Sequence, residues 1–308
     1  MTDRRTEGAS LIERAAALYD FMAYLPAGTA APARDAVPAP EPAPVRVMAQ
    51  EPAVEAVPDA ARVPEAAPVA GPSGIVDVAG LAEAGFIIPG APVSAIAEEF
   101  RIAKRHLLLD AAGAARNRMI LISSAQPGEG KSFCALNLAL SMASERDVEV
   151  LIVDADFAKP SILSTLGLAG GAGLMDAIAD PEVDVERLIV RTDIPRLSVL
   201  PAGARSHEDT EYLASARTAA VLDGLVASHP ARIVLFDSPP VLAASPASVL
   251  ALHVGQTLVV VRADRTGEGE LREAVALLSG CADVKLLLND VTLPAGGQRF
   301  GSYYGYAR

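Results

Sequence analysis

The sequence predicts an α/β fold in which a mostly parallel sheet is flanked by helices. From residue 117 onwards, apolar runs of strand length alternate with segments of helical spacing. Residues 150–153, 233–236 and 258–261 are continuously apolar, as expected for strands covered by helices on both faces. The expected strands are 118–123, 149–154, 197–200, 232–237, 257–262 and 285–289, and the expected helices are 131–145, 174–179, 210–228, 245–252 and 267–278.

A phosphate-binding loop (P-loop) follows the first of these strands. Residues 127–132 read Pro-Gly-Glu-Gly-Lys-Ser and lead directly into a helix, so backbone N–H groups and the helix N-terminus can surround an anion. In such a loop Lys131 reaches the β- and γ-phosphates, and the Ser132 hydroxyl ligates Mg²⁺. The chain is therefore expected to bind ATP with Mg²⁺. The residues expected to contact the nucleotide are Gln126, Pro127, Gly128, Glu129, Gly130, Lys131, Ser132 and Phe133.

The loop departs from the usual pattern at its start. Ala125 stands where the motif normally has its first glycine. Alanine is suitable if this position needs no positive φ. The alternative interpretation is a glycine-rich turn between strand and helix that binds no ligand.

Acidic side chains stand where two later strands end. Ligands of parallel sheets bind at the carboxyl ends of the strands. Asp154 and Asp156 follow one strand and are expected to face Mg²⁺ and the γ-phosphate; the alternative is a polar turn that caps the next helix. Asp237 ends another strand, the usual place for the acid that holds Mg²⁺ or its water. Asn289 ends the last strand and is interpreted either as a contact to the adenine edge or as a turn residue.

Composition limits the class of protein. The 308 residues are 51% hydrophobic, enough for one sizeable α/β domain with additions. The net charge of −12 argues against a nucleic-acid partner held by bulk electrostatics. No apolar run approaches the roughly 20 residues of a membrane span, and no secretory signal is recognised. Cys134 and Cys281 are expected to be buried thiols, so a cytoplasmic location is predicted, with any membrane association through a partner.

Four segments are predicted along the chain. Residues 1–25 contain a short helix, either a docking helix or a frayed end, and residues 26–74 form a disordered linker rich in alanine and proline. Residues 75–291 form the P-loop domain, with a lead-in and a helix over 75–110. Residues 292–308 form a flexible tail that contains Tyr303, Tyr304 and Tyr306.

The helix expected over 94–109 has two distinct faces. Ile96, Phe100, Ala103 and Leu107 form its apolar side. Glu98, Arg101 and Lys104 place both charge signs on one ridge, which is suitable for pairing with another subunit. A solvated charged face is the alternative interpretation.

The tail offers candidate phosphate acceptors. Three of the six tyrosines lie within the last six residues. Their hydroxyls, on a flexible strip, can enter an active site, where Asp154 is placed to accept the proton that a tyrosine must lose. The alternative is a sticky aromatic tail or a segment that adds as a strand.

Together these motifs resemble those of the bacterial tyrosine kinases (BY-kinases) of capsule and exopolysaccharide loci. More narrowly, they resemble the free-standing cytoplasmic tyrosine autokinases of exosortase (PEP-CTERM) clusters. The resemblance covers residues 75–308 and a short stretch at 10–14. It rests on Pro-Gly-Glu-Gly-Lys-Ser at 127–132, Asp-Ala-Asp at 154–156, Phe-Asp-Ser-Pro-Pro at 236–240, the charged ridge at 98–104 and the tyrosine tail.

The resemblance implies a P-loop NTPase fold of the deviant-Walker (ParA/MinD-like) type. It implies autophosphorylation of the tail in trans within a ring, activation by a membrane-embedded chain-length partner, and a tyrosine phosphatase as a further partner. In such an enzyme Asp154 is the base, Asp156 and Asp237 organise Mg²⁺ with Ser132, and Lys131 contacts the phosphates. The residues that join subunits would be Glu98, Arg101 and Lys104.

Two departures from the family pattern stand out. Ala158 and Lys159 occupy the region where an arginine is common, and Lys104 replaces an arginine capable of bidentate pairing. Two other functions remain open. One is a ParA/MinD-like regulatory ATPase without kinase activity, and the other is a nucleotide-gated scaffold that has lost turnover.

Overall fold

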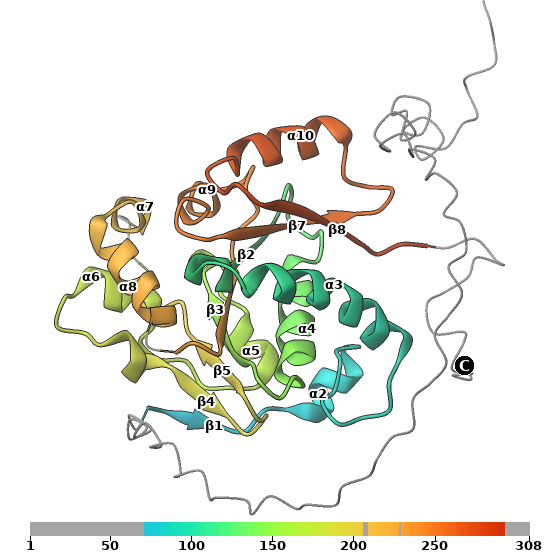
Figure 1. Ribbon diagram of the computed structural model, residues 1–308, viewed down its shortest axis with the longest axis horizontal. Coiled ribbons are helices and arrows are strands. Elements are labelled where there is room, and N and C mark those ends of the chain that lie inside the picture. Colours follow the sequence, from blue (N-terminus) through green and yellow to red (C-terminus); the bar gives the residue numbers. More distant parts are fainter. Residues whose placement is uncertain (1–70, 206–208, 228, 293–308) are drawn as a thin grey trace, which may run out of the picture. The chain divides into compact units, whose positions relative to one another are not determined.

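An eight-stranded sheet lies at the centre of residues 71–205, 209–227 and 229–292, the part of the chain that the computed structural model describes (Figure 1). The strand order is β1-β4-β5-β3-β6-β2-β7-β8. All neighbouring pairs are parallel except β4 with β5, so the predicted mostly parallel sheet is confirmed. The strands are β1 (Ser73–Gly74), β2 (Met119–Ser124), β3 (Glu149–Asp154), β4 (Val190–Thr192), β5 (Leu197–Leu200), β6 (Arg232–Asp237), β7 (Gln256–Arg262) and β8 (Val284–Asn289).

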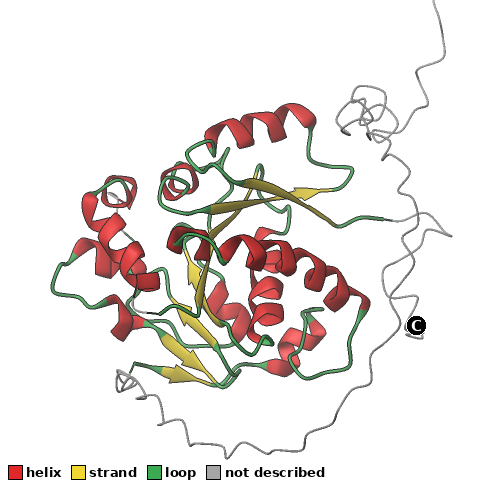
Figure 2. Cartoon of the chain, viewed as in Figure 1, coloured by secondary structure: helices red, strands yellow, loops and turns green. Residues whose placement is uncertain are grey.

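Helices cover both faces of the sheet (Figure 2). Alternate residues of β2 point to opposite cores, with Met119 and Leu121 in one and Ile120 and Ile122 in the other. The first core contains side chains of α6 (Leu174–Ala179), α7 (Asp209–Leu213), α8 (Ala216–Ala227), α9 (Pro246–Leu250) and α10 (Glu268–Leu277). The second core contains side chains of α2 (Val78–Glu83), α3 (Ala95–Ala111), α4 (Lys131–Ala143) and α5 (Ile162–Leu166). This two-sided burial explains the continuous apolar runs in the sequence.

The structure contains the six predicted strands and corrects one predicted helix. The helix expected over 210–228 is two helices, α7 and α8. The interruption comes at Ser215, whose hydroxyl accepts the Thr218 N–H at 3.4 Å and so caps a new helix. The short elements β1, β4, α2 and α5 were not predicted as strands or helices. The N-terminal helix, most of the linker and the tyrosine tail lie outside the described residues, so the four-segment division stays a prediction.

The two cysteines were expected to be buried thiols. Cys134 and Cys281 are both free and buried, as predicted. Burial raises the pKa of the Cys134 thiol to about 12, with a smaller contribution from Asp237.

Among the helices that the structure describes, none combines the length and the hydrophobicity required to cross a bilayer.

Helix α3 is fastened to α4 by a buried lysine. Ser94 caps α3 by accepting the Ala97 N–H at 3.3 Å. The Lys104 ammonium donates to the Ser141 carbonyl at 2.7 Å and pairs with Glu145, also at 2.7 Å. Ser141 is in the last turn of α4, where carbonyls lack partners within the helix. Lys104 is therefore engaged inside the chain.

Glu98 and Arg101 are placed differently from Lys104. They pair with each other at 2.6 Å on the outside of α3, with the Arg101 side chain 48% exposed. This pair remains available to another subunit, whereas Lys104 serves the fold of its own chain. The proposed joining of subunits by all three residues stays a prediction.

Replacing Lys104 by methionine tests the buried brace. Lys104→Met leaves the Ser141 carbonyl and the Glu145 carboxylate without their partner, so we expect the free energy of unfolding to fall by about 1–3 kcal/mol. Arg101→Met, the control on the exposed side, should change it by less than about 1 kcal/mol. Urea unfolding gives both values. A change of oligomeric state in Lys104→Met with no loss of stability would contradict this role.

Candidate nucleotide-binding and phosphoryl-transfer site

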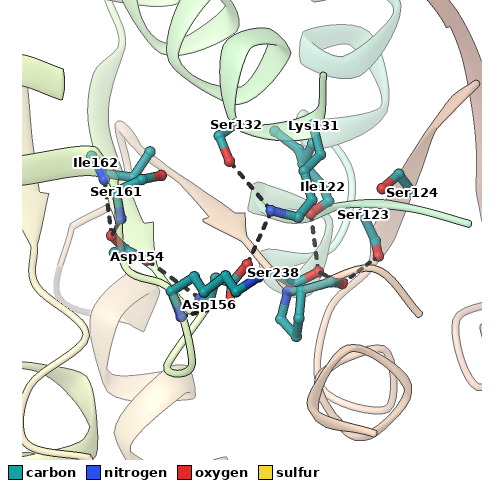
Figure 3. Close-up of polar contacts among 12 residues, drawn as sticks. Ile122, Ser123, Ser124, Lys131, Ser132, Asp154, Asp156, Ser161, Ile162 and Ser238 are labelled. Carbon is teal, nitrogen blue, oxygen red and sulfur yellow. Dashed lines mark hydrogen bonds and ion pairs between the residues drawn. The ribbon is translucent and has the colours of Figure 1, made fainter. Parts of the chain in front are cut away.

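The register of the central strands brings the predicted acids together. Asp154 at the end of β3 is the direct neighbour of Asp237 at the end of β6, and Asp237 is in turn the neighbour of Ile122 in β2. The ends of β6 and β2 are tied further by Ser238, which donates to the Ile122 carbonyl at 3.0 Å, and by Ser123, which donates to the Pro239 carbonyl at 2.9 Å (Figure 3). Because β2 runs into the P-loop, these carboxylates lie beside it.

The P-loop takes its shape from two glycines. Gly128 has φ +78° and Gly130 has φ +94°, both in the left-handed region that favours glycine. A Cβ on Gly130 would lie 2.1 Å from Nδ2 of Asn289, so a side chain at this position would displace the Asn289 amide. Ala125 is not among the described non-glycine residues that have a positive φ. The alanine at the start of the loop is therefore compatible with its backbone, as expected.

Lys131 points from the start of α4 toward the acids. Its ammonium lies 3.0 Å from Oδ2 of Asp156 and 3.3 Å from the Ser132 hydroxyl (Figure 3). The other carboxylate oxygen of Asp156 accepts the Lys159 N–H at 3.1 Å. Ala158 and Lys159 are both exposed in this turn. The site thus contains a lysine that pairs directly with one acid and also contacts a serine hydroxyl.

Asp154 is engaged by backbone donors. Its Oδ2 accepts the N–H groups of Ser161 at 2.8 Å and Ile162 at 2.9 Å, which begin α5, and its Oδ1 accepts the Asp156 N–H at 3.3 Å (Figure 3). The helix-capping interpretation of this acid is thus seen in the structure. Burial raises the pKa of Asp154 even though these three hydrogen bonds lower it. A carboxylate with a raised pKa is also a stronger base than an ordinary aspartate.

Asp237 differs from the other two acids. It is fully buried, and neither carboxylate oxygen has a hydrogen-bond partner among the described residues. Burial raises its pKa to about 7, although the nearby Lys131 ammonium and Ser132 hydroxyl lower it. An unpaired buried carboxylate is costly, and such groups normally bind a partner or a metal ion. Both oxygens of Asp237 are therefore available to a cation.

Residues on the far side of the P-loop were missed by the sequence analysis. Thr266, on the turn between β7 and α10, donates a hydrogen bond to Glu129 of the loop, and Arg262, the last residue of β7, donates one to the Gly128 carbonyl. Asn289 donates from Nδ2 to the Glu129 carbonyl at 3.0 Å, and this contact was not among the two roles expected for it. The rule that ligands lie at strand ends could have drawn attention to residues 262–266, because they follow β7 at the same edge of the sheet.

Two neighbouring hollows flank this side of the loop. One, of about 260 Å³, is lined by the loop itself together with Phe133, Arg262, Asn289 and Asp290. The other, of about 570 Å³, shares Phe133 and Asn289 and extends over apolar side chains such as Ile96 and Phe100 of α3. A planar, mostly apolar group attached to a phosphate chain fits such a surface. The predicted contact of Asn289 with an adenine remains a prediction.

Comparison with known proteins shows which proteins this chain resembles. A model of the ParA family, described as a NUBPL iron-transfer P-loop NTPase, matches residues 115–199. A putative tyrosine-protein kinase EpsB of Ralstonia nicotianae is 33% identical over 201 residues, which cover 62% of this chain and 26% of EpsB. A putative tyrosine-protein kinase CapB of Staphylococcus aureus is 27% identical over 217 residues, which cover 70% of this chain and 91% of CapB.

Solved structures agree with these relatives. The kinase domain of the Escherichia coli tyrosine kinase ETK superposes with a TM-score of 0.60 at 25% identity, covering 69% of this chain and 82% of that domain. The chimerical protein CapA2B2 superposes with a TM-score of 0.57 at 26% identity, covering 70% of this chain and 92% of the chimera. The chain spans 26–30% of the length of the two EpsB relatives. The chain is thus a homologue of the bacterial tyrosine-protein kinases and has the P-loop α/β fold of their kinase domains.

Proposed function

We propose that this chain is an ATP- and Mg²⁺-dependent protein-tyrosine kinase that phosphorylates the tail tyrosines of a neighbouring copy. The observation that carries the proposal is the group of three acids beside Lys131 at one edge of the sheet, in a chain whose relatives are named tyrosine-protein kinases. Its biological role would be the regulation of exopolysaccharide synthesis or export.

The residues present fit a magnesium ion. The two oxygens of Asp237 have no hydrogen-bond partner among the described residues, and carboxylate and hydroxyl oxygens are the ligands that Mg²⁺ prefers. Ser132, Asp156 and Asp237 would hold the ion, either directly or through water. When bound, Mg²⁺ offsets the negative charge of the phosphates.

The side chains of this chain would then perform the transfer. Asp154 takes the proton from a tyrosine hydroxyl, whose oxygen attacks the γ-phosphorus of ATP. The bond between that phosphorus and the β–γ bridging oxygen breaks, and ADP leaves. Lys131, released from its ion pair with Asp156, faces the negative charge of the phosphates. Tyr303, Tyr304 and Tyr306 are the proposed acceptors.

The proposed partners follow from the same relatives. We propose a ring of copies joined through the helix that contains Glu98 and Arg101, an activator protein embedded in the membrane, and a tyrosine phosphatase that removes the phosphate. The likeness of this chain both to CapB and to the solved chimera CapA2B2 supports a partner of the activator kind. The proposed location is the cytoplasm, where the activator would hold the chain at the inner membrane. No nucleic-acid partner is proposed, because the net charge of −12 would repel a polyanion.

The second candidate function is a ParA/MinD-like regulatory ATPase without protein-kinase activity. The match of residues 115–199 to the ParA family favours it. It would use the P-loop and the same acids, but it gives no role to the three tyrosines of the tail. Detection of phosphotyrosine distinguishes the two functions.

Removal of the loop lysine should abolish transfer. We expect Lys131→Met, assayed with Mg·ATP and the cytoplasmic segment of the activator, to reduce tyrosine labelling about a hundredfold or more, because charge stabilisation is lost. Arg272→Met, which removes an exposed cation from α10, is the control and should retain labelling. Mass spectrometry that finds no phosphotyrosine in a wild-type chain that binds ATP would contradict the kinase proposal.

Replacement of the tail tyrosines tests the acceptor. Labelling should be lost when Tyr303, Tyr304 and Tyr306 are all changed to phenylalanine, since the attacking hydroxyls are then gone. Tyr212→Phe, in α7, should leave labelling unchanged and serves as the matched control. Undiminished labelling of the triple variant would show that the acceptor lies elsewhere.

The buried acid also predicts a pH dependence of stability. Between about pH 4 and pH 7 the folded chain retains a proton on Asp237 that the unfolded chain has lost, so stability of the metal-free protein should fall as pH rises through this window. Asp237→Asn removes this contribution and should stabilise the metal-free protein at pH 8 by up to roughly 4 kcal/mol. The smaller slope due to Asp154, which has the same sign, should remain.

Urea unfolding in EDTA at pH 4.5, 6 and 8 measures the effect. The same Asn variant should lose the extra stability that Mg·ATP gives to the wild-type chain. Equal pH slopes in the wild-type and variant chains would contradict the assignment of a raised pKa to Asp237.

A further inference from the structure

The outer rim of the P-loop is fastened from outside by the turn between β7 and α10 and by the end of β8. We propose that Thr266 and Glu129 are positioning residues that hold the loop in its anion-binding shape before a nucleotide arrives. This inference rests on the nucleotide-binding part of the proposed function and does not depend on the transfer to tyrosine.

A partly buried relay of hydrogen bonds, centred on the buried carboxylate of Glu129, connects the end of β7 to the start of the loop. The Arg262 N–H donates to the Thr266 hydroxyl at 2.9 Å, and this hydroxyl donates to Oε1 of Glu129. The other carboxylate oxygen of Glu129 accepts the Gln126 N–H at 2.9 Å. The threonine hydroxyl thus both accepts and donates, and each oxygen of the carboxylate has a donor.

The Glu129 carboxylate is in an unfavourable location for a negative charge. Glu129 is only 3% exposed and lies inside a loop expected to bind phosphate, so its negative charge is costly both to bury and to place near an anion. Hydrogen bonds to an ionised carboxylate are stronger than neutral ones. Glu129 also lies between Gly128 and Gly130, which both have positive φ. Glycine has more backbone freedom than any other residue. The anchored side chain of Glu129 therefore restricts a stretch in which the two neighbouring glycines would otherwise allow many backbone conformations.

Two carbonyls of the loop are held on the same side. Nη1 of Arg262 donates to the Gly128 carbonyl at 3.1 Å, and Nδ2 of Asn289 donates to the Glu129 carbonyl at 3.0 Å. The described chain contains no cis peptide bond, and in a trans peptide the C=O and the following N–H point in opposite directions. The N–H groups of Glu129 and Gly130 consequently point away from β7 and β8. Convergent N–H groups of this kind form the anion site of such loops.

The hydrogen bonds to the buried Glu129 carboxylate should contribute more to the shape of the loop than the more exposed ion pair beside them. Arg262 and Asp290, which form an ion pair at 2.6 Å, have side chains that are 32% and 57% exposed. Exposed pairs of this kind contribute little. Loss of the Thr266 hydroxyl, by contrast, leaves a buried carboxylate oxygen and the Arg262 N–H without partners.

Binding of ADP and AMP tests the proposal on the full chain. We expect Thr266→Val to weaken Mg·ADP binding about tenfold, as measured with a fluorescent ADP analogue, because a hydrogen bond to a charged group is lost. Thr266→Ser retains the hydroxyl and should stay within about twofold of the wild-type affinity. The affinity for AMP, measured by competition, should fall less than the affinity for ADP, so the preference for ADP over AMP decreases. A general loss of folded protein would instead reduce the binding of both nucleotides equally.

A matched pair of carboxylate changes supplies the second test. Glu129→Gln should weaken ADP binding to a similar degree, whereas Glu268→Gln makes the same chemical change at an exposed carboxylate paired with Arg272 and should have no effect. Wild-type affinity in both Thr266→Val and Glu129→Gln, or an equal loss for ADP and AMP, would overturn the proposal. A wild-type chain that binds no ADP would contradict this inference and the proposed function together. Binding of ADP without tyrosine transfer would contradict the kinase alone.

Discussion

Parallel pairing of the central strands is the constraint on which the candidate site depends. The sheet register aligns Asp154 with Asp237 and places both beside the strand that runs into the P-loop. Because all three strands are buried on both faces, a slip by one residue would exchange the side chains that face the two cores. The apolar packing of the sheet therefore also fixes where the polar groups lie. The geometry of the candidate site is a consequence of core packing.

The negative charges of the site lie close together, and a bound cation can relieve their repulsion. Three acids lie together, and the buried carboxylate of Asp237 has no hydrogen-bond partner in the described chain. Lys131 compensates one of them, Asp156, by a direct ion pair. Such an arrangement is poor for stability and suitable for a cation and a phosphate chain, which supply the missing charges. The acids that destabilise the metal-free protein are thus the groups proposed to act in transfer.

The sequence was informative where periodicity and strand ends were involved. Long apolar strands such as β3 and β6 were predicted at their observed bounds, since two-sided burial leaves a clear pattern. The short strands β1 and β4 lack enough residues for a pattern, and the break at Ser215 depends on a single cap. The acids beside the loop were predicted from the strand-end rule, which needs no knowledge of side-chain conformation.

Contacts between distant segments could not be predicted in the same way. The interactions of Thr266 and Asn289 with Glu129 join residues more than a hundred positions apart, and nothing in local sequence reports such a pairing. The inward direction of Lys104 likewise depends on where the C-terminus of α4 ends. A ridge of charges predicts a surface only when each side chain points outward, and this lysine does not. Sequence patterns therefore located the acids beside the P-loop better than the contacts that support the loop.

Transfer of phosphate between two copies of the chain can be tested by a mixing experiment. One copy contains Lys131→Met and an intact tail, and the other contains the wild-type loop with Tyr303, Tyr304 and Tyr306 changed to phenylalanine. After incubation of the mixture with Mg·ATP and the activator segment, mass spectrometry locates any phosphotyrosine. We expect phosphate on the tail of the Lys131→Met copy. An unlabelled tail on that copy, under conditions in which the wild-type chain labels itself, would contradict transfer between copies.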